Sequence, residues 1–436
     1  MSVRRLTTTA VGADLSGTTA GATRRLLAGR AARRARGVPW VRGRPWRLAL
    51  VKGALAYVFS RFLVLAAGGI VAGADAYRAI TNASQDVVGG DPRPSSAAKF
   101  VTQLLTSWDG KWYLSIVRLG YPRRIVNPVT YFDDDARVAF FPGFPLLVRA
   151  VNRVLPGGDT AAALLLNVVL GGVFILLVGL LARRFGGDRL AGRAMMLAAF
   201  FPGSFVLSFA YSEALFTCLA AATLLLLLDR RWLWAGVLTA LATATRPNGL
   251  ALVLACAVAA LLACRGPDGW RWRWRPIVGA LISPLGFVAF QVFLARHTGE
   301  RGVWFRVQRQ AWSEGASFGL AAVTKTVNFT LHPFHSAVNV VTALCVVATL
   351  GLLVALWKAK LPAVVNAYTG GVVFMMLLPA TVTARPRFLF TAFPLLIAFA
   401  KVWPKKDDDW WAMLLGLCGA GLIGVTTLYG LLAAIP

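Results

Sequence analysis

The sequence predicts an all-α polytopic membrane protein, a bundle of roughly eleven transmembrane helices. Hydrophobic residues make up 57% of its 436 residues. Apolar runs long enough to cross a bilayer recur almost to the last residue, and short basic segments separate them. The net charge of +28 is therefore assigned to topology and anionic lipid headgroups. No nucleic-acid recognition motif accompanies the charge, so we predict no nucleic-acid partner.

The first 47 residues differ from the rest of the chain. Residues 1–47 are polar and carry eleven arginines against one acid, Asp14. This composition predicts a disordered basic tail that holds the N-terminus in the cytoplasm. The first apolar run, 48–73, is too long and too far into the chain for a cleaved signal peptide, so we interpret it as the first span of a transmembrane domain covering 48–436.

The later spans follow closely on one another, with long loops on one side only. We place them at 160–182, 190–208, 211–228, 232–245, 248–264, 276–295, 336–357, 362–382, 387–403 and 410–434. The predicted inner loops are 183–189, 229–231, 265–275, 358–360 and 404–409, and all but the last carry a basic excess, as the positive-inside rule requires. In an inner or plasma membrane, the loops 74–158 and 297–335 then lie on the extracytoplasmic face.

The first of these outer loops contains an acidic residue in an aromatic setting, SWDGKWYLSIVRLGYP (107–122). If 109–119 is a helix, one stripe carries Asp109, Trp112, Tyr113, Ile116 and Val117. Asp109 then either caps an interfacial helix or serves as a base beside the bilayer. Further along, 139–155 has two prolines and two arginines, so we expect a second interfacial helix.

Arginines also stand where the topology disfavours them. The outer turns at 244–250 and 383–388 hold Arg246 followed by Asn248, and Arg385 with Arg387. Short outer loops normally avoid arginine. Ordinary interface anchoring explains such residues singly, but together they indicate a grip on a phosphate, which suits the guanidinium fork.

Three other polar features were open to two interpretations each. Arg61, in the middle of the first span, either snorkels or pairs with a carboxylate inside the bundle, and we favour a paired or cavity-lining role. Glu213 either caps a helix or pairs with an arginine. The acidic run 133–135 is a solvated loop or a site for a divalent cation, which leaves a cation possible. We predict no metal site and no cofactor.

Four motifs together resemble a known family. WD-x-x-W-Y-L-x-I-x-x-x-GY (108–121), AFFPGFPLL (139–147), F-x-YSEALF (209–216) and ATRPNGL (244–250) resemble the PIG-V family of GPI mannosyltransferase 2 proteins, and the layout resembles the C-type multi-spanning glycosyltransferases. The resemblance implies a polyprenyl-phosphate-mannose donor, inverting transfer and a catalytic aspartate, here Asp109. Eukaryotic members differ at Trp112 and at 135–136, and the arginine-rich composition resembles that of bacterial proteins, which indicates a bacterial glycolipid, glycan or protein acceptor.

These observations combine into one hypothesis, an extracytoplasmic mannosyltransferase embedded in the bilayer. Asp109 is the expected general base, and Arg246, Arg385 and Arg387 are expected to hold the donor phosphate. Residues expected to contact or support the substrates are Trp108, Trp112, Tyr113, Glu213, Asn248 and Asp135. The alternatives are a transporter or flippase of a polyprenyl-linked sugar and a non-catalytic subunit of a glycosylation complex.

Overall fold

The computed structural model describes residues 45–81, 97–265, 274–313, 315–332, 335–379, 386–404 and 408–431. The predicted basic tail lies outside these residues up to position 44, and so does Arg385. Regular structure in the described residues is helical, apart from one isolated antiparallel bridge between Ala316 and Pro379. The all-α prediction is therefore confirmed for this part of the chain.

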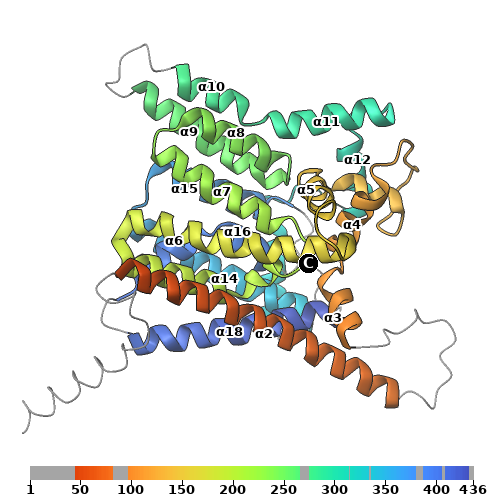
Figure 1. Ribbon diagram of the computed structural model, residues 1–436, viewed down its shortest axis with the longest axis horizontal. Coiled ribbons are helices and arrows are strands. Elements are labelled where there is room, and N and C mark those ends of the chain that lie inside the picture. The colour runs from red at the N-terminus through yellow and green to blue at the C-terminus, as the bar shows by residue number, and fades with distance from the viewer. Residues whose placement is uncertain are drawn as a thin grey trace, which may run out of the picture. The chain divides into compact units, whose positions relative to one another are not determined.

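Most helices coincide with predicted spans, but the spans predicted at 276–295 and 387–403 each comprise two helices. The helices in the predicted spans are α2 (Pro45–Thr81), α6 (Gly158–Phe200), α7 (Glu213–Leu228), α8 (Trp232–Thr243), α9 (Leu250–Arg265), α10 (Trp274–Ile282), α11 (Leu285–Thr298), α14 (Ala337–Ala359), α15 (Ala363–Leu377), α16 (Pro386–Thr391), α17 (Pro394–Val402) and α18 (Asp408–Gly430). Figure 1 shows α7 packed between α6 and α8, and α9 beside α15. Six helical segments of the described residues are long and apolar enough to cross a membrane, so the chain is a multi-pass membrane protein.

Glycine and proline decide where predicted spans are joined or broken. The spans predicted at 160–182 and 190–208 form one merged helix, α6, whose helical geometry is interrupted at Gly186 and Gly187. Gly187 has φ of 74°, a left-handed conformation that glycine adopts without a steric penalty. The second half stops at Phe200 because Pro202 opens a short 3₁₀ helix, η3 (Pro202–Leu207).

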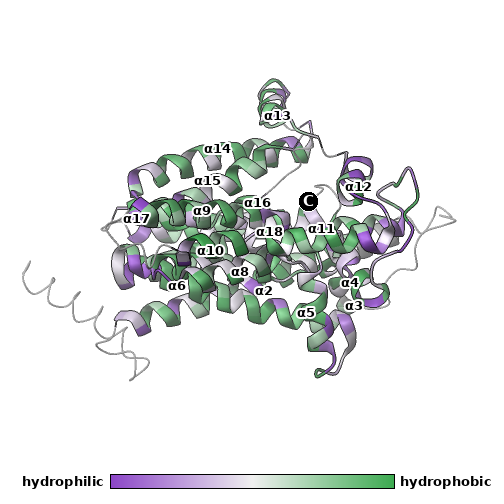
Figure 2. Cartoon of the chain, turned by 90° about the horizontal axis from the view of Figure 1, so that it is seen from above, coloured by the Kyte–Doolittle hydropathy of each residue, from purple (hydrophilic) through white to green (hydrophobic). Residues whose placement is uncertain are grey.

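The segments predicted to share the inner face contact one another. Arg184 lies 2.6 Å from Asp229, so the segment 183–189 contacts 229–231. Arg193 lies 3.0 Å from Asp408, which joins the same region of α6 to the start of α18. In Figure 2 the hydrophilic residues gather near α17 at one end of the helices and near α12 at the other. The grouping agrees with the predicted assignment of loops to two faces.

Arg61 is held inside the bundle by hydroxyl and carbonyl oxygens, and no carboxylate of the described residues pairs with it. Its guanidinium donates to the carbonyl and hydroxyl oxygens of Ser204 at 2.8 and 2.9 Å and to the hydroxyl of Ser208 at 3.0 Å. Arg61 therefore has partners inside the bundle and does not snorkel, but the partners are neutral oxygens and not the expected carboxylate. Carbonyl and hydroxyl dipoles near the end of α6 and in η3 replace water around the cation, which ties α2 to η3.

The two predicted outer loops are partly helical and pack on each other. The first contains α3 (Ala97–Leu105), α4 (Asp109–Leu119), the 3₁₀ helix η2 (Asp134–Ala139) and α5 (Gly143–Asn152). The second contains α12 (Val303–Trp312) and α13 (Leu320–Leu331). The indole Nε1 of Trp304 donates to the carbonyl oxygen of Ala139 at 3.0 Å, so α12 is fixed against the first loop. Helix α4 has the predicted bounds, and its predicted apolar stripe is buried.

Candidate active site

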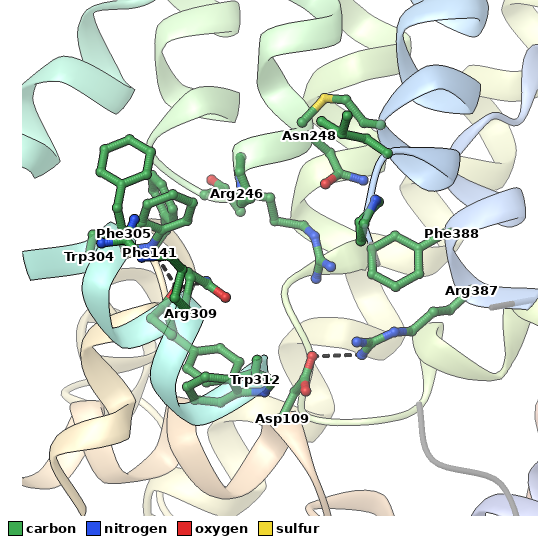
Figure 3. Close-up of a pocket in the computed structure, with 18 of the residues that line it drawn as sticks. Asp109, Phe141, Arg246, Asn248, Trp304, Phe305, Arg309, Trp312, Arg387 and Phe388 are labelled. Atoms are coloured by element: carbon green, nitrogen blue, oxygen red, sulfur yellow. Dashed lines mark hydrogen bonds and ion pairs between the residues drawn. The ribbon is translucent and has the colours of Figure 1, made fainter. Parts of the chain in front are cut away.

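A cavity of about 450 Å³ lies where the two outer loops meet the turn before α9 and the start of α16. Residues that the sequence singled out share this cavity although they are far apart along the chain: Asp109, Tyr113, Arg246, Asn248 and Arg387. Figure 3 shows Asp109, Arg246 and Arg387 together on one side, with residues of α12 on the other side. The structure therefore brings the predicted carboxylate to two of the three predicted phosphate-binding arginines.

Asp109 and Arg387 both line the cavity and form an ion pair. It is the first residue of α4, and its Oδ2 accepts a hydrogen bond from Nη1 of Arg387 at 2.6 Å. The side chain of Asp109 is 15% exposed, so solvent or a substrate can reach it. Among the described residues no donor is bound to its Oδ1. The carboxylate thus forms an ion pair through Oδ2 on a partly exposed side chain, and no side-chain hydrogen bond caps this helix.

Glu213 forms the second ion pair, behind the cavity. Its side chain is fully buried at the start of α7, with Oε2 2.9 Å from Nη1 of Arg246 and Oε1 3.7 Å from Nη1 of Arg387. Glu213 was expected either to cap a helix or to pair with an arginine, and in the structure it pairs with an arginine. Because Glu213 lies between the two guanidiniums, it offsets the repulsion between buried cations and fixes both of them beside Asp109.

A short hydrogen-bonded chain continues this network to α4. Nη1 of Arg246 donates to the hydroxyl of Ser212 at 3.0 Å, and the hydroxyls of Ser212 and Tyr113 lie 2.6 Å apart. Burial is the main cause that raises the pKa of Tyr113, so this phenol stays protonated and remains a hydrogen-bonding group at neutral pH. Ser212 was not singled out by the sequence, because a serine before a helix is usually only a cap.

The cavity carries more positive than negative charge. The ion-paired side has Arg246 and Arg387 against Asp109 and Glu213, and α12 adds an exposed arginine, Arg309. Arg309 contacts no carboxylate among the described residues. The Nε atoms of Arg246 and Arg387 are buried and have no hydrogen-bond acceptor in the described part of the chain. Both carboxylate oxygens of Glu213 are likewise buried without a hydrogen-bond donor, so it is the excess of one positive charge that suits the site to an anionic ligand.

Close backbone approaches hold the arginine-bearing turns in place. A Cβ at Gly203 in η3 would collide with the carbonyl oxygen of Pro386, so the absence of a side chain there lets α16 and Arg387 approach η3. The amide of Gly143 donates to the carbonyl oxygen of Ala244 at 2.9 Å, which ties the end of the first outer loop to the turn that carries Arg246.

The remaining predicted site residues lie away from the cavity lining. Trp108 donates its indole N–H to the carbonyl oxygen of Tyr429 at 3.4 Å. Trp112 is 1% exposed and belongs to an aromatic cluster below the cavity. Asp135 accepts a hydrogen bond from the amide of Val126 at 3.0 Å, so it shapes the first loop.

The acidic run does not gather into a cation site. Asp133 accepts hydrogen bonds from the amide and hydroxyl of Thr130, and these bonds lower the pKa of its carboxyl. Within the described ranges, no three His, Cys, Asp or Glu side chains form a group that could hold a metal ion.

The sequence analysis missed the contribution of α12. Trp304, Phe305, Gln308, Arg309 and Trp312 line the cavity. Their spacing places them along one side of a helix, while Val303 and Val307 face the core formed with the first loop. This periodicity was present in 303–312, but only the tertiary contacts show that the polar and aromatic side of the helix closes a cavity.

Comparisons with known proteins give no family. No protein-family model and no curated protein sequence matches the chain. Among solved structures, the chain is similar to ArnT from Cupriavidus metallidurans bound to undecaprenyl phosphate, with 13% identity and a TM-score of 0.43 over 77% of this chain and 75% of that one.

A second similar structure is the archaeal oligosaccharyltransferase AglB from Archaeoglobus fulgidus in complex with an inhibitory peptide and a dolichol-phosphate. The identity is 14% and the TM-score 0.37, over 73% of this chain and 51% of that one. This chain therefore spans about half the length of that enzyme. Function is inferred below from the cavity and the motifs.

Proposed function

We propose that this protein is a C-type-like membrane glycosyltransferase that transfers mannose from polyprenyl-phosphate mannose to a hydroxyl group of an extracytoplasmic acceptor, with inversion. The observation that carries the proposal is the accessible carboxylate of Asp109 beside the buried guanidiniums of Arg246 and Arg387 in one cavity. The resemblance of the four motifs to the PIG-V family supports the choice of mannose and of a lipid-phosphate donor.

The chemistry is a single displacement. The acceptor oxygen forms a bond to the anomeric carbon, and its proton passes to Oδ1 of Asp109. The bond between the anomeric carbon and the phosphate oxygen breaks, and its electron pair leaves with the phosphate. Because attack and departure occur on opposite sides of the anomeric carbon, the configuration inverts. A positioned base of this kind contributes a rate factor of about 10²–10⁴.

The arginines supply the charge that the departing phosphate needs. A polyprenyl-phosphate sugar is a phosphodiester with one negative charge, and the cavity has three arginines against two carboxylates. The terminal nitrogens of the guanidiniums that line the cavity would bind the phosphate oxygens. Preorganised cations in a poorly hydrated site stabilise developing negative charge more strongly than water does.

An apolar edge of the cavity suits the lipid part of the donor. Met375, Leu378 and Pro379, at the end of α15, line the cavity together with Phe388 beside Arg387. A phosphate held at Arg387 would direct the first isoprene units along these side chains. The donor would then have its charge on the arginines and its hydrocarbon against α15 and the neighbouring bilayer.

The test is transfer by the purified full-length protein in lipid nanodiscs. Labelled polyprenyl-phosphate mannose is mixed with a panel of hydroxyl acceptors, and labelled glycoside is measured for the wild-type protein and for Asp109→Asn. We expect product from the wild-type protein and a loss of about 10²-fold or more in the variant. Asp159→Asn is the matched control, since Asp159 lies outside the cavity lining, where it pairs with the 55% exposed Arg118 and accepts a hydrogen bond from Asn152.

Three results would overturn the proposal. Near-normal turnover by Asp109→Asn would show that Asp109 is not the general base. In liposomes, movement of the labelled lipid between leaflets without any new glycoside would indicate the flippase alternative, and neither movement nor product would indicate a non-catalytic subunit.

A further inference from the structure

Three consecutive residues contact the two arginines of the candidate site. The guanidinium carbon of Arg387 lies 5.6 Å from the centroid of the Tyr211 ring. The hydroxyl of Ser212 accepts a hydrogen bond from Arg246 at 3.0 Å. Glu213 lies 2.9 Å from Arg246 and 3.7 Å from Arg387. The positions of both guanidiniums therefore depend on where the backbone of 211–213 lies.

The segment that leads to these residues is buried although it is not a regular helix. Residues 208–212 connect η3 to α7, and every residue from 203 to 214 is buried. Within the segment, the amide of Ala210 donates to the carbonyl oxygen of Leu105 at 2.8 Å. Carbonyl oxygens in a buried irregular segment need donors from elsewhere in the fold, because water does not reach them.

Asn167 supplies two of these donors from α6, the neighbour of α7 (Figure 1). Its side-chain nitrogen donates to the carbonyl oxygens of Phe209 and, at 2.7 Å, of Tyr211. Carbonyl oxygens only accept, so the NH2 group must face the turn. The side chain is fully buried, and its Oδ1 has no donor in the described part of the chain. The two N–H bonds are therefore what this side chain contributes.

A purely stabilising role is the alternative for a buried asparagine, and Arg61 shows what such a role looks like. Arg61 also donates to buried oxygens of the region between α6 and α7, at Ser204 and Ser208. The difference lies in the residues that are held. Asn167 bonds to Tyr211, which itself contacts a site arginine and directly precedes the other two contacting residues.

We propose that Asn167 is a positioning residue of the donor-phosphate site. It fixes the turn that ends at Tyr211, and residues 211–213 then hold the guanidiniums of Arg246 and Arg387 in place for the phosphate. Loss of the two donors would leave buried carbonyl oxygens unpaired, and the turn would move to find others. In a preorganised site a displacement of about 1 Å can cost a factor of about 10² in rate. This inference rests on the proposed function and adds a residue that acts on the donor from outside the cavity lining.

The experiment measures phosphate binding separately from turnover. Labelled polyprenyl phosphate is titrated onto the purified full-length protein in detergent micelles to obtain Kd, and the nanodisc assay gives KM for the donor and for the acceptor. Asn167→Leu removes both donors at similar side-chain volume. We expect it to raise Kd and the donor KM by about tenfold, as for the loss of two hydrogen bonds, and to change the acceptor KM less than about twofold.

Arg61→Met is the matched control, because it removes buried donors from the same region without touching the turn at 209–211. It should lower the free energy of unfolding and leave Kd unchanged. Asn167→Asp keeps the inference testable if Asn167→Leu folds poorly. As a buried neutral acid it retains the shape and one of the two donors, so Kd should rise by about threefold.

The outcomes separate this inference from the proposed function. An unchanged Kd in Asn167→Leu and Asn167→Asp would overturn the positioning role, and so would an equal rise in Arg61→Met, since Asn167 would then only stabilise the fold. Both results leave glycoside formation by the wild-type protein intact. A wild-type protein that binds polyprenyl phosphate but forms no glycoside loses the proposed function, while the Kd of the variants still decides the role of Asn167. A wild-type protein that does neither overturns both.

Discussion

Glu213 is expected to be the most sensitive stabilising residue of the candidate site. Its side chain is fully buried, 2.9 Å from Arg246 and 3.7 Å from Arg387. At an effective dielectric constant of about 20, the attraction at the shorter distance is about 6 kcal/mol before desolvation is subtracted. Glu213→Gln removes the charge and leaves two buried guanidiniums with one carboxylate between them. We expect it to lower the free energy of unfolding by about 3–5 kcal/mol, the usual cost of breaking a buried pair.

The measurement is an unfolding titration in mixed detergent micelles, followed by circular dichroism. The matched control is Asp159→Asn, which removes the charge that pairs with the exposed Arg118 while the asparagine Oδ1 can still accept the hydrogen bond from Asn152, so it should cost no more than about 1 kcal/mol. A double variant, Glu213→Gln with Arg246→Met, should recover part of the loss, because it removes the cation that the single variant leaves unpaired.

The reasoning would be refuted by one pattern in particular. If Glu213→Gln unfolds within about 1 kcal/mol of the wild-type protein, as the surface control does, Glu213 does not compensate buried charge. The same conclusion follows if the double variant is less stable than the single one by the full cost of Arg246→Met alone, since the two residues would then be energetically independent.

Three further predictions concern positioning. Gly203→Ala should lower both stability and turnover, because its Cβ would push the start of α16 away, whereas Gly416→Ala, where a Cβ meets nothing within 4 Å, should leave turnover unchanged in the nanodisc assay. Arg61→Met should lower the free energy of unfolding by about 1–3 kcal/mol in the unfolding titration, because carbonyl and hydroxyl groups lose their buried donor. It should leave the KM values for donor and acceptor unchanged. The hydrogen bond from Arg306 lowers the pKa of Glu300. The ion pair therefore stabilises the folded state above the ordinary carboxyl pKa of about 4.3, and this stabilisation is lost as the pH falls. Glu300→Gln should remove this pH dependence of the free energy of unfolding, which is worth at most about 1 kcal/mol.

Local patterns predicted single elements well. The spacing of apolar residues after Asp109 predicted a helix over 109–119, and the structure has that helix with its apolar stripe buried. Glycine and proline limited the accuracy of boundaries, since the pair at 186–187 interrupts α6 without a separate loop and Pro202 ends the second half of that helix early. Hydropathy reports burial or lipid contact, but it does not register a local change of backbone direction.

Arg61 shows why polar partners inside the bundle were harder to predict. The sequence indicated that a mid-span arginine needs a partner, and a carboxylate was the simplest choice. The structure instead supplies carbonyl and hydroxyl oxygens from residues 199–208, more than 130 positions away. Backbone oxygens are present at every residue, so no sequence signal marks which of them will be turned toward a cation.

The sequence by itself determined the helical multi-pass architecture and marked Asp109, Arg246, Glu213 and Arg387 as candidates, each with a structural alternative. Only the tertiary structure decided that these residues form two linked ion pairs in one cavity and that α12 supplies its opposite wall. The physical reason is that burial and periodicity are local properties of a chain. Charge compensation depends instead on distances between segments up to 278 residues apart, such as Asp109 and Arg387, and folding alone sets those distances.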